Sequence, residues 1–195
     1  QFIDTKCTDH DYRLNRNYKN GKASINAFLD DYSLTIEAFI QLYQATFDEQ
    51  WLKKAEKLAE YTITHFYDEK SGMFYYTSNQ DEALIARKME LADNVIPGSN
   101  SSMAKALYLL GTYNYKPKYV AMAKQMLTNV KQNMMNQGPF YSNWADLTTF
   151  FVKAPYEVAI VGENCNELRK ELDAKYLPHV VFIGGKTEGD LELLQ

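Results

Sequence analysis

The chain has 195 residues, and its 21 lysines and arginines against 25 aspartates and glutamates give a formal charge of −4. This mild acidity excludes the basic stripe that nucleic-acid binding requires. No apolar run is long enough to cross a membrane, and Cys7 and Cys165 have no metal-binding or redox spacing. The length suits one domain with a sizeable core, and 15 tyrosines supply more than half of the aromatic residues.

Helical hairpins dominate the predicted structure. Apolar residues at helical spacing predict a helix over 31–47 and another that Asp48 can cap and that ends near residue 66. The link between them is so short that the two helices must lie antiparallel. The same unit recurs over 99–113 and from Pro117 onward, a period of roughly 65 residues that is typical of helical repeat architectures. A fifth helix is expected over 142–153.

The links between the hairpins differ from the links within them. The longest joins two hairpins over 67–98, and two of its pieces, 73–77 and 84–89, have strand propensity. Before the first helix, Asn20-Gly21 predicts a type I′ turn in a β-hairpin. Because hairpins alternate in direction, all the long links fall at one end of the helical layer. Long links inside a compact domain are often functional.

The pattern changes after Pro155. Apolar runs at 156–161 and 179–183 flank a segment of helical pattern at 167–176. A strand, a crossover helix and a second strand predict a parallel βαβ unit. Two strands are too few to be stable alone, so we expect this unit to pack on the helices.

Acidic and amide side chains cluster where two helices start from the same end of the layer. Asp30 and Asp31 open the first helix, and Asp93 and Asn100 flank the start of the third. Paired carboxylates on one rim can divide the roles of acid and base once their environments separate their pKa values. Asp and Asn are also preferred N-caps, and capping alone can account for each residue. A helix uses one cap, however, so one of Asp30 and Asp31 has no such explanation.

Cationic and aromatic side chains are expected on the same rim. Arg16 and Arg87 could pair with the carboxylates or bind an anionic substrate, or they could be solvated surface charges. Aromatic side chains in the links could stack on sugar rings, although part of any such set must face a core. These aromatic residues are Tyr18, Phe74, Tyr75, Tyr76, Phe140, Tyr141 and Trp144. No histidine has a partner at ligand spacing, so we assign no metal and no cofactor.

Several blocks of the sequence resemble one family. Residues 28–32 (FLDDY), followed by Glu37-Ala38 and Leu42-Tyr43, resemble a block in large thioredoxin-domain proteins whose C-terminal part is similar to N-acylglucosamine 2-epimerases. The spermatogenesis-associated thioredoxin-like proteins belong to this group. Further blocks match in the family's order: 18–21 (YKNG), 82–87 (EALIAR), 93–101 (DNVIPGSNS) and 156–162 (YEVAIVG).

The resemblance implies a mainly α fold. Residues 1–154 would form a partial (α/α) toroid of the six-hairpin type, with short β-hairpins in its links, and residues 155–195 a small βαβ appendage packed on the helices. A full toroid needs about twelve helices, so we expect this chain to be the C-terminal part of a longer protein, cut before Gln1. Its partners would be the remaining hairpins and the thioredoxin-like domain of its own full-length protein. We also expect self-association through uncovered helix faces, no nucleic-acid or membrane partner, and a cytoplasmic location.

Two functional hypotheses follow. In the first, the chain is a fragment of a sugar-active or sugar-binding toroid, similar to epimerases and glycosidases, and its ligand is a sugar or a sugar derivative. Asp31 or Asp93 would transfer the proton, and the substrate would be bound by Arg16, Tyr18, Asp30, Arg87, Asn100 and Trp144. The epimerases use histidines for proton transfer, and no inward pair of histidines is evident here. In the second hypothesis, the toroid is a non-catalytic module that recognises clients for the thioredoxin-like domain.

Overall fold

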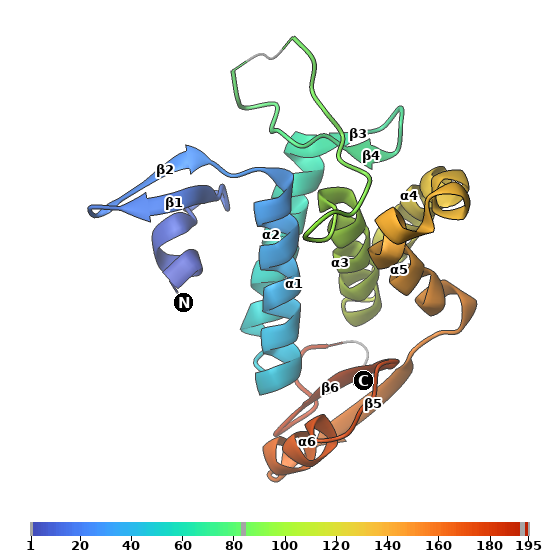
Figure 1. Cartoon of the computed structure of the whole chain (residues 1–195). Coiled ribbons are helices and arrows are strands. Elements are labelled where there is room, and N and C mark those ends of the chain that lie inside the picture. Colours follow the sequence, from blue (N-terminus) through green and yellow to red (C-terminus); the bar gives the residue numbers. More distant parts are fainter. Residues whose placement is uncertain (1, 83–84, 192–193, 195) are drawn as a thin grey trace.

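A computed structural model describes residues 2–82, 85–191 and 194. Two antiparallel helical hairpins and a further helix form its body (Figure 1). The helices are α1 (Leu29–Thr46), α2 (Gln50–Phe66), α3 (Ser99–Tyr113), α4 (Pro117–Asn136) and α5 (Ser142–Val152). Helix α1 packs on both α2 and α3, and α3 packs on α4 and α5. This alternation of inner helices (α1, α3, α5) and outer helices (α2, α4) confirms the partial (α/α) toroid.

The helix boundaries follow from local signals in the sequence. Helix α4 starts at Pro117, as expected from the fixed φ of proline, and α3 spans the predicted range. Helix α1 starts two residues before the predicted position, because Asp31 accepts a hydrogen bond from the Phe28 N–H and so occupies the third helical position. At its other end, Phe47 adopts the left-handed conformation, with φ of 55°, and turns the chain into α2.

One apolar core fills the space between the helices. It includes the fully buried rings of Tyr32, Tyr43, Tyr113 and Trp144, which come from all three inner helices. Tyr43 and Tyr113 meet edge to face, with ring centroids 5.3 Å apart. Several of the 15 tyrosines are therefore part of the apolar core. Among the described residues, no helix combines the length and apolar character needed to span a bilayer.

The long links lie at the end of the layer where α1 and α3 begin (Figure 1). The predicted first hairpin is confirmed as β1 (Asn15–Lys19) and β2 (Lys22–Asn26), and Asn20 and Gly21 have the positive φ values of a type I′ turn. In the longest link, β3 (Tyr67–Asp68) pairs with β4 (Met73–Phe74), so the predicted strand at 73–77 is only two residues long.

The strand predicted at 84–89 is wrong for the residues that can be assessed. Residue 84 lies outside the described chain, and residues 85–89 contain no strand. The side chain of Ile85 is fully exposed, whereas Met89, at the end of the segment, packs against the core. The carbonyl of Lys88 accepts a hydrogen bond from the Tyr76 N–H, which ties the segment to the link without forming a ladder.

The βαβ unit lies at the opposite end of the helices (Figure 1). Strand β5 (Tyr156–Val161) pairs in parallel with β6 (Val180–Gly185), and α6 (Cys165–Asp173) joins them. The unit packs on the last turns of α1 and α3: the Gly184 N–H donates to the Tyr43 hydroxyl at 3.3 Å, and the Tyr113 hydroxyl donates to the Phe182 carbonyl. The expected packing on the helices is thus observed, while a domain boundary at residue 154 stays a prediction.

Candidate functional site

Three of the predicted site residues meet at the start of α1. The guanidinium of Arg16, on β1, lies 3.6 Å from a carboxylate oxygen of Asp30 and 3.7 Å from one of Asp31. The two carboxylates are adjacent in the first turn of the helix, where its dipole favours negative charge. We call these residues, together with Phe28 and Tyr76, the rim cluster.

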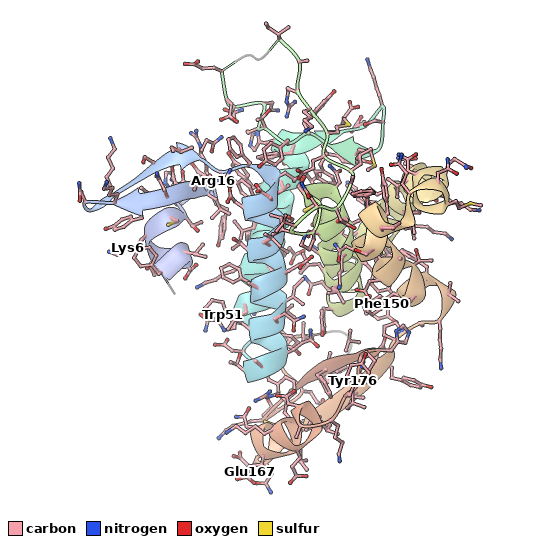
Figure 2. The ribbon with its side chains drawn as sticks, in the orientation of Figure 1. Lys6, Arg16, Trp51, Phe150, Glu167 and Tyr176 are labelled. Carbon is pink, nitrogen blue, oxygen red and sulfur yellow. The ribbon has the colours of Figure 1, made fainter. Side chains whose placement is uncertain are left out.

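Two aromatic rings complete the rim cluster. Phe28 and Tyr76 stack with centroids 5.0 Å apart, and the guanidinium of Arg16 lies 4.9 Å from the centre of the Phe28 ring. The Tyr76 carbonyl accepts a hydrogen bond from the Leu29 N–H, so the backbone of the link is fastened to the start of α1. Figure 2 shows Arg16 on the β1–β2 hairpin close to this helix end.

The electrostatics of the rim cluster separate Asp31 from an ordinary surface carboxylate. Burial raises the pKa of Asp31, and the charge of Asp30 acts in the same direction; the hydrogen bond from the Phe28 N–H and the charge of Arg16 oppose this shift. A hydrogen bond with the Tyr76 hydroxyl and the two nearby carboxylates raise the pKa of Arg16, which stays cationic. The cluster thus contains a fixed cation and a carboxyl group that is protonated more readily than usual.

Asp93 lies in a different set of contacts. It is only 6% exposed, and it accepts hydrogen bonds from the Gly98 N–H at 2.8 Å, the Ser101 hydroxyl at 2.7 Å and the Asn143 N–H at 2.8 Å. These donors belong to the starts of α3 and α5, so the carboxylate joins two inner helices. Both its oxygens are engaged in this structural task, and we do not retain Asp93 as a proton-transfer residue.

Asn100 and Trp144 are also parts of the framework. Asn100 is fully buried; its amide accepts from the Phe74 N–H and donates to the carbonyls of Phe74 and Glu90, which holds β4 against the start of α3. Trp144 is fully buried, and its indole N–H donates to the Leu91 carbonyl at 2.8 Å. The structure therefore offers neither side chain to a ligand, in contrast to the prediction that they bind substrate.

Arg87 and Tyr18 point to local partners rather than to the carboxylates. The guanidinium of Arg87 donates to the backbone carbonyls of His65 and Thr77 and lies 4.1 Å from the centre of the Tyr75 ring. It therefore satisfies a carbonyl at the C-terminal end of α2. Tyr18 is half-buried and packs edge to face on Phe2, with centroids 5.1 Å apart. Neither residue joins the rim cluster through these contacts.

One polar residue on the inner wall was not predicted as a site residue. Glu37 lies two turns into α1, and burial raises its pKa to about 7. Lys105 and Ser102 of α3 and Asp146 of α5 are the polar groups that face it. In the sequence, Glu37 stands out only as part of the Glu37-Ala38 block of the family resemblance. The available signal was its spacing from Asp30, which is seven residues or two helical turns.

The residues that the structure describes contain no group of three or more His, Cys, Asp or Glu side chains able to hold a metal ion. Cys7 and Cys165 are both buried and unpaired with each other.

No family model matches the chain. It is 27% identical, over 190 residues, to an uncharacterized protein of Caenorhabditis elegans, and the match covers 91% of this chain but 25% of that protein. The chain thus spans about a quarter of the length of the curated relative that it matches.

A solved structure gives the fold comparison. The GH76 alpha-mannanase of Bacteroides thetaiotaomicron superposes with a TM-score of 0.52 and 12% sequence identity, over 73% of this chain and 40% of that chain. At this identity the likeness concerns the fold alone, and it supports the toroid architecture. Neither comparison bears on a thioredoxin-like domain, which stays a prediction.

Proposed function

We propose that this chain contributes a carbohydrate-binding or carbohydrate-processing rim to an (α/α) toroid. The rim cluster is the observation that supports the proposal most directly: two carboxylates and a guanidinium are placed beside a stacked pair of aromatic rings. Carboxylate and guanidinium groups form directed hydrogen bonds with sugar hydroxyls, and aromatic faces pack on the C–H faces of sugar rings. The fold shared with a mannanase agrees with this assignment.

Within this proposal, Asp31 is the proton-transfer group. Its raised pKa brings it closer to the range in which a carboxyl group can both hold and release a proton near neutral pH. Asp30, which lies beside the same guanidinium, accepts hydrogen bonds from the ligand. Arg16 and the ring of Phe28 orient the sugar.

The proposal is tested by measuring sugar binding and aryl glycoside hydrolysis with the 195-residue chain. The panel contains mannosides, because the structural neighbour is named as an alpha-mannanase, together with glucosides and N-acetylglucosamine. We expect Asp31→Asn to abolish turnover while it retains the fold, since an asparagine oxygen still accepts from the Phe28 N–H.

Asp48→Asn is the matched control. Asp48 also accepts a backbone hydrogen bond at a helix start, from the Gln50 N–H, but it precedes α2 and lies outside the rim cluster. Equal effects of the two substitutions, or an absence of binding to any sugar in the panel, would contradict the proposal. The second outcome would instead favour the non-catalytic recognition module.

A further inference from the structure

A hollow of about 430 Å³ lies on the inner wall of the toroid, at the end opposite the rim cluster. It opens between the last turns of α1, the inner faces of α3 and α5, and the βαβ unit. Figure 2 shows Phe150 at the end of α5 that faces this unit. The volume of the hollow falls within the range of small-molecule sites. The lining residues that matter most are Gln41, Gln44, Lys105, Asp146, Phe150 and Arg169.

The charges in the hollow balance one another. Lys105 forms an ion pair with Asp146, and Arg169 forms one with Asp173. These four are the charged residues of the lining. Since each cation already has a carboxylate partner, the hollow presents no surplus charge with which to select an anion or a cation.

The lining of the hollow, as far as the structure describes it, has no unpaired charge, but it does have a polar atom without a hydrogen-bond partner. Arg169 is 8% exposed, and its Nε atom is buried without a hydrogen-bond partner among the described residues. Leaving such a donor unpaired is costly, which makes the atom a candidate for contact with a bound group.

Two amide side chains add further donors and acceptors. Gln41 and Gln44 line the hollow from α1, and the ring of Phe150 supplies an apolar wall. The side-chain oxygen of Gln44 already accepts a hydrogen bond from the Phe182 N–H, so Gln44 offers mainly its N–H donors. A ligand that satisfies this set needs several donors and acceptors close together, an apolar face and no net charge. A sugar ring or a cyclic polyol has these properties.

We propose that this hollow binds a small, uncharged, polyhydroxylated molecule of monosaccharide size, with Arg169 and Gln41 as its principal hydrogen-bonding residues. This inference rests on the proposed function and adds to it a second subsite on the same inner wall. A hydroxyl oxygen of the ligand accepts from Arg169 Nε, and a second hydroxyl group pairs with the side-chain amide of Gln41.

The test is isothermal titration of the 195-residue chain with mannose, glucose and myo-inositol, each at up to tens of millimolar. Glucose 6-phosphate and glucosamine serve as charged counterparts. We expect at least one neutral probe to bind and its charged counterpart to bind at least about tenfold more weakly. Arg169→Met should weaken binding of the neutral probe by about 10- to 100-fold, the usual effect of losing a hydrogen bond to a charged group.

Lys170→Met is the matched control, because Lys170 is an exposed cation on the same helix. It should leave affinity unchanged. If Arg169→Met fails to fold, Gln41→Met, which keeps the approximate size of the side chain, provides the second variant and should also weaken binding. Failure of all neutral probes to bind, or binding that both variants leave intact, would overturn the inference.

The rim variants separate this inference from the proposed function. Sugar binding that is lost in Asp30→Asn but retained in Arg169→Met and Gln41→Met would overturn the inference about the hollow and leave the proposed function standing. Binding that depends on Arg169 and not on Asp30 would support the inference about the hollow and count against the rim cluster.

Discussion

Asp93→Ala removes one buried carboxylate that joins the starts of α3 and α5. Three donors lose an acceptor, but the Ser101 hydroxyl also bonds to the Gly98 carbonyl at 2.8 Å and keeps that partner. Two backbone N–H groups then lose their acceptor: that of Gly98, which is buried, and that of Asn143, which is partly buried. At about 1–3 kcal/mol for the buried group and less for the partly buried one, the free energy of unfolding should fall by about 2–4 kcal/mol. That is a large part of the stability of an ordinary domain.

Urea unfolding followed by circular dichroism measures this loss. Asp93→Asn retains one acceptor oxygen, so its free energy of unfolding should lie between those of the wild type and Asp93→Ala. The control is Asp48→Ala, which removes an exposed acceptor for the Gln50 N–H just before α2 and should cost about 1 kcal/mol. If Asp93→Ala costs no more than this control, or raises stability as substitutions of strained active-site residues can, Asp93 is not the structural link described above.

Three further predictions concern the core and the inner wall. Burial raises the pKa of Glu37 from an ordinary value of 4.5 to about 7, so the folded state binds a proton that the unfolded chain releases between these pH values. The free energy of unfolding should therefore fall by up to about 3 kcal/mol as pH rises from 5 to 8. In Glu37→Gln, urea titrations should no longer show this fall. If the variant keeps the pH dependence of the wild type, the burial of the carboxyl is contradicted. Trp144→Phe leaves the Leu91 carbonyl without its indole donor and should cost about 1–3 kcal/mol in thermal unfolding, whereas an unchanged Tm would show that water replaces the indole. Gly111→Ala places a Cβ 2.7 Å from Cγ2 of Val120 and should lower the Tm despite the higher helix propensity of alanine, and a raised Tm would show that α3 and α4 separate easily.

The helical framework could be predicted from the sequence because its signals are local. Apolar spacing and Pro117 were sufficient to place four helices and their pairing, and α3 has the predicted bounds. The strand at 84–89 failed for the opposite reason. A strand needs a partner, and propensity within six residues does not reveal whether another segment lies alongside.

The candidate site was harder to predict, because capping residues and site residues are of the same chemical types. Asp31 and Asp93 each precede or begin a helix, and nothing in their neighbours distinguishes them. The difference arises from distant partners: Asp93 contacts Asn143, 50 residues away, whereas Asp31 contacts Arg16 across a β-hairpin. Only the folded chain shows that Asp93 joins two helices and that Asp31 pairs with Arg16 at the rim.

The rim cluster and the hollow are connected by one face of α1. Asp30, Glu37, Gln41 and Gln44 follow one another at spacings of seven, four and three residues, which places them in a single stripe along the helix. At 1.5 Å per residue, the stripe is about 21 Å long. Core-facing positions of this helix are occupied by residues such as Ile36 and Tyr43. Gln44 also fastens strand β6 to α1, because its side-chain oxygen accepts a hydrogen bond from the Phe182 N–H at 3.4 Å. If the rim cluster and the hollow both bind sugar, substitutions of Gln41 between them should weaken the binding of an oligosaccharide more than that of a monosaccharide.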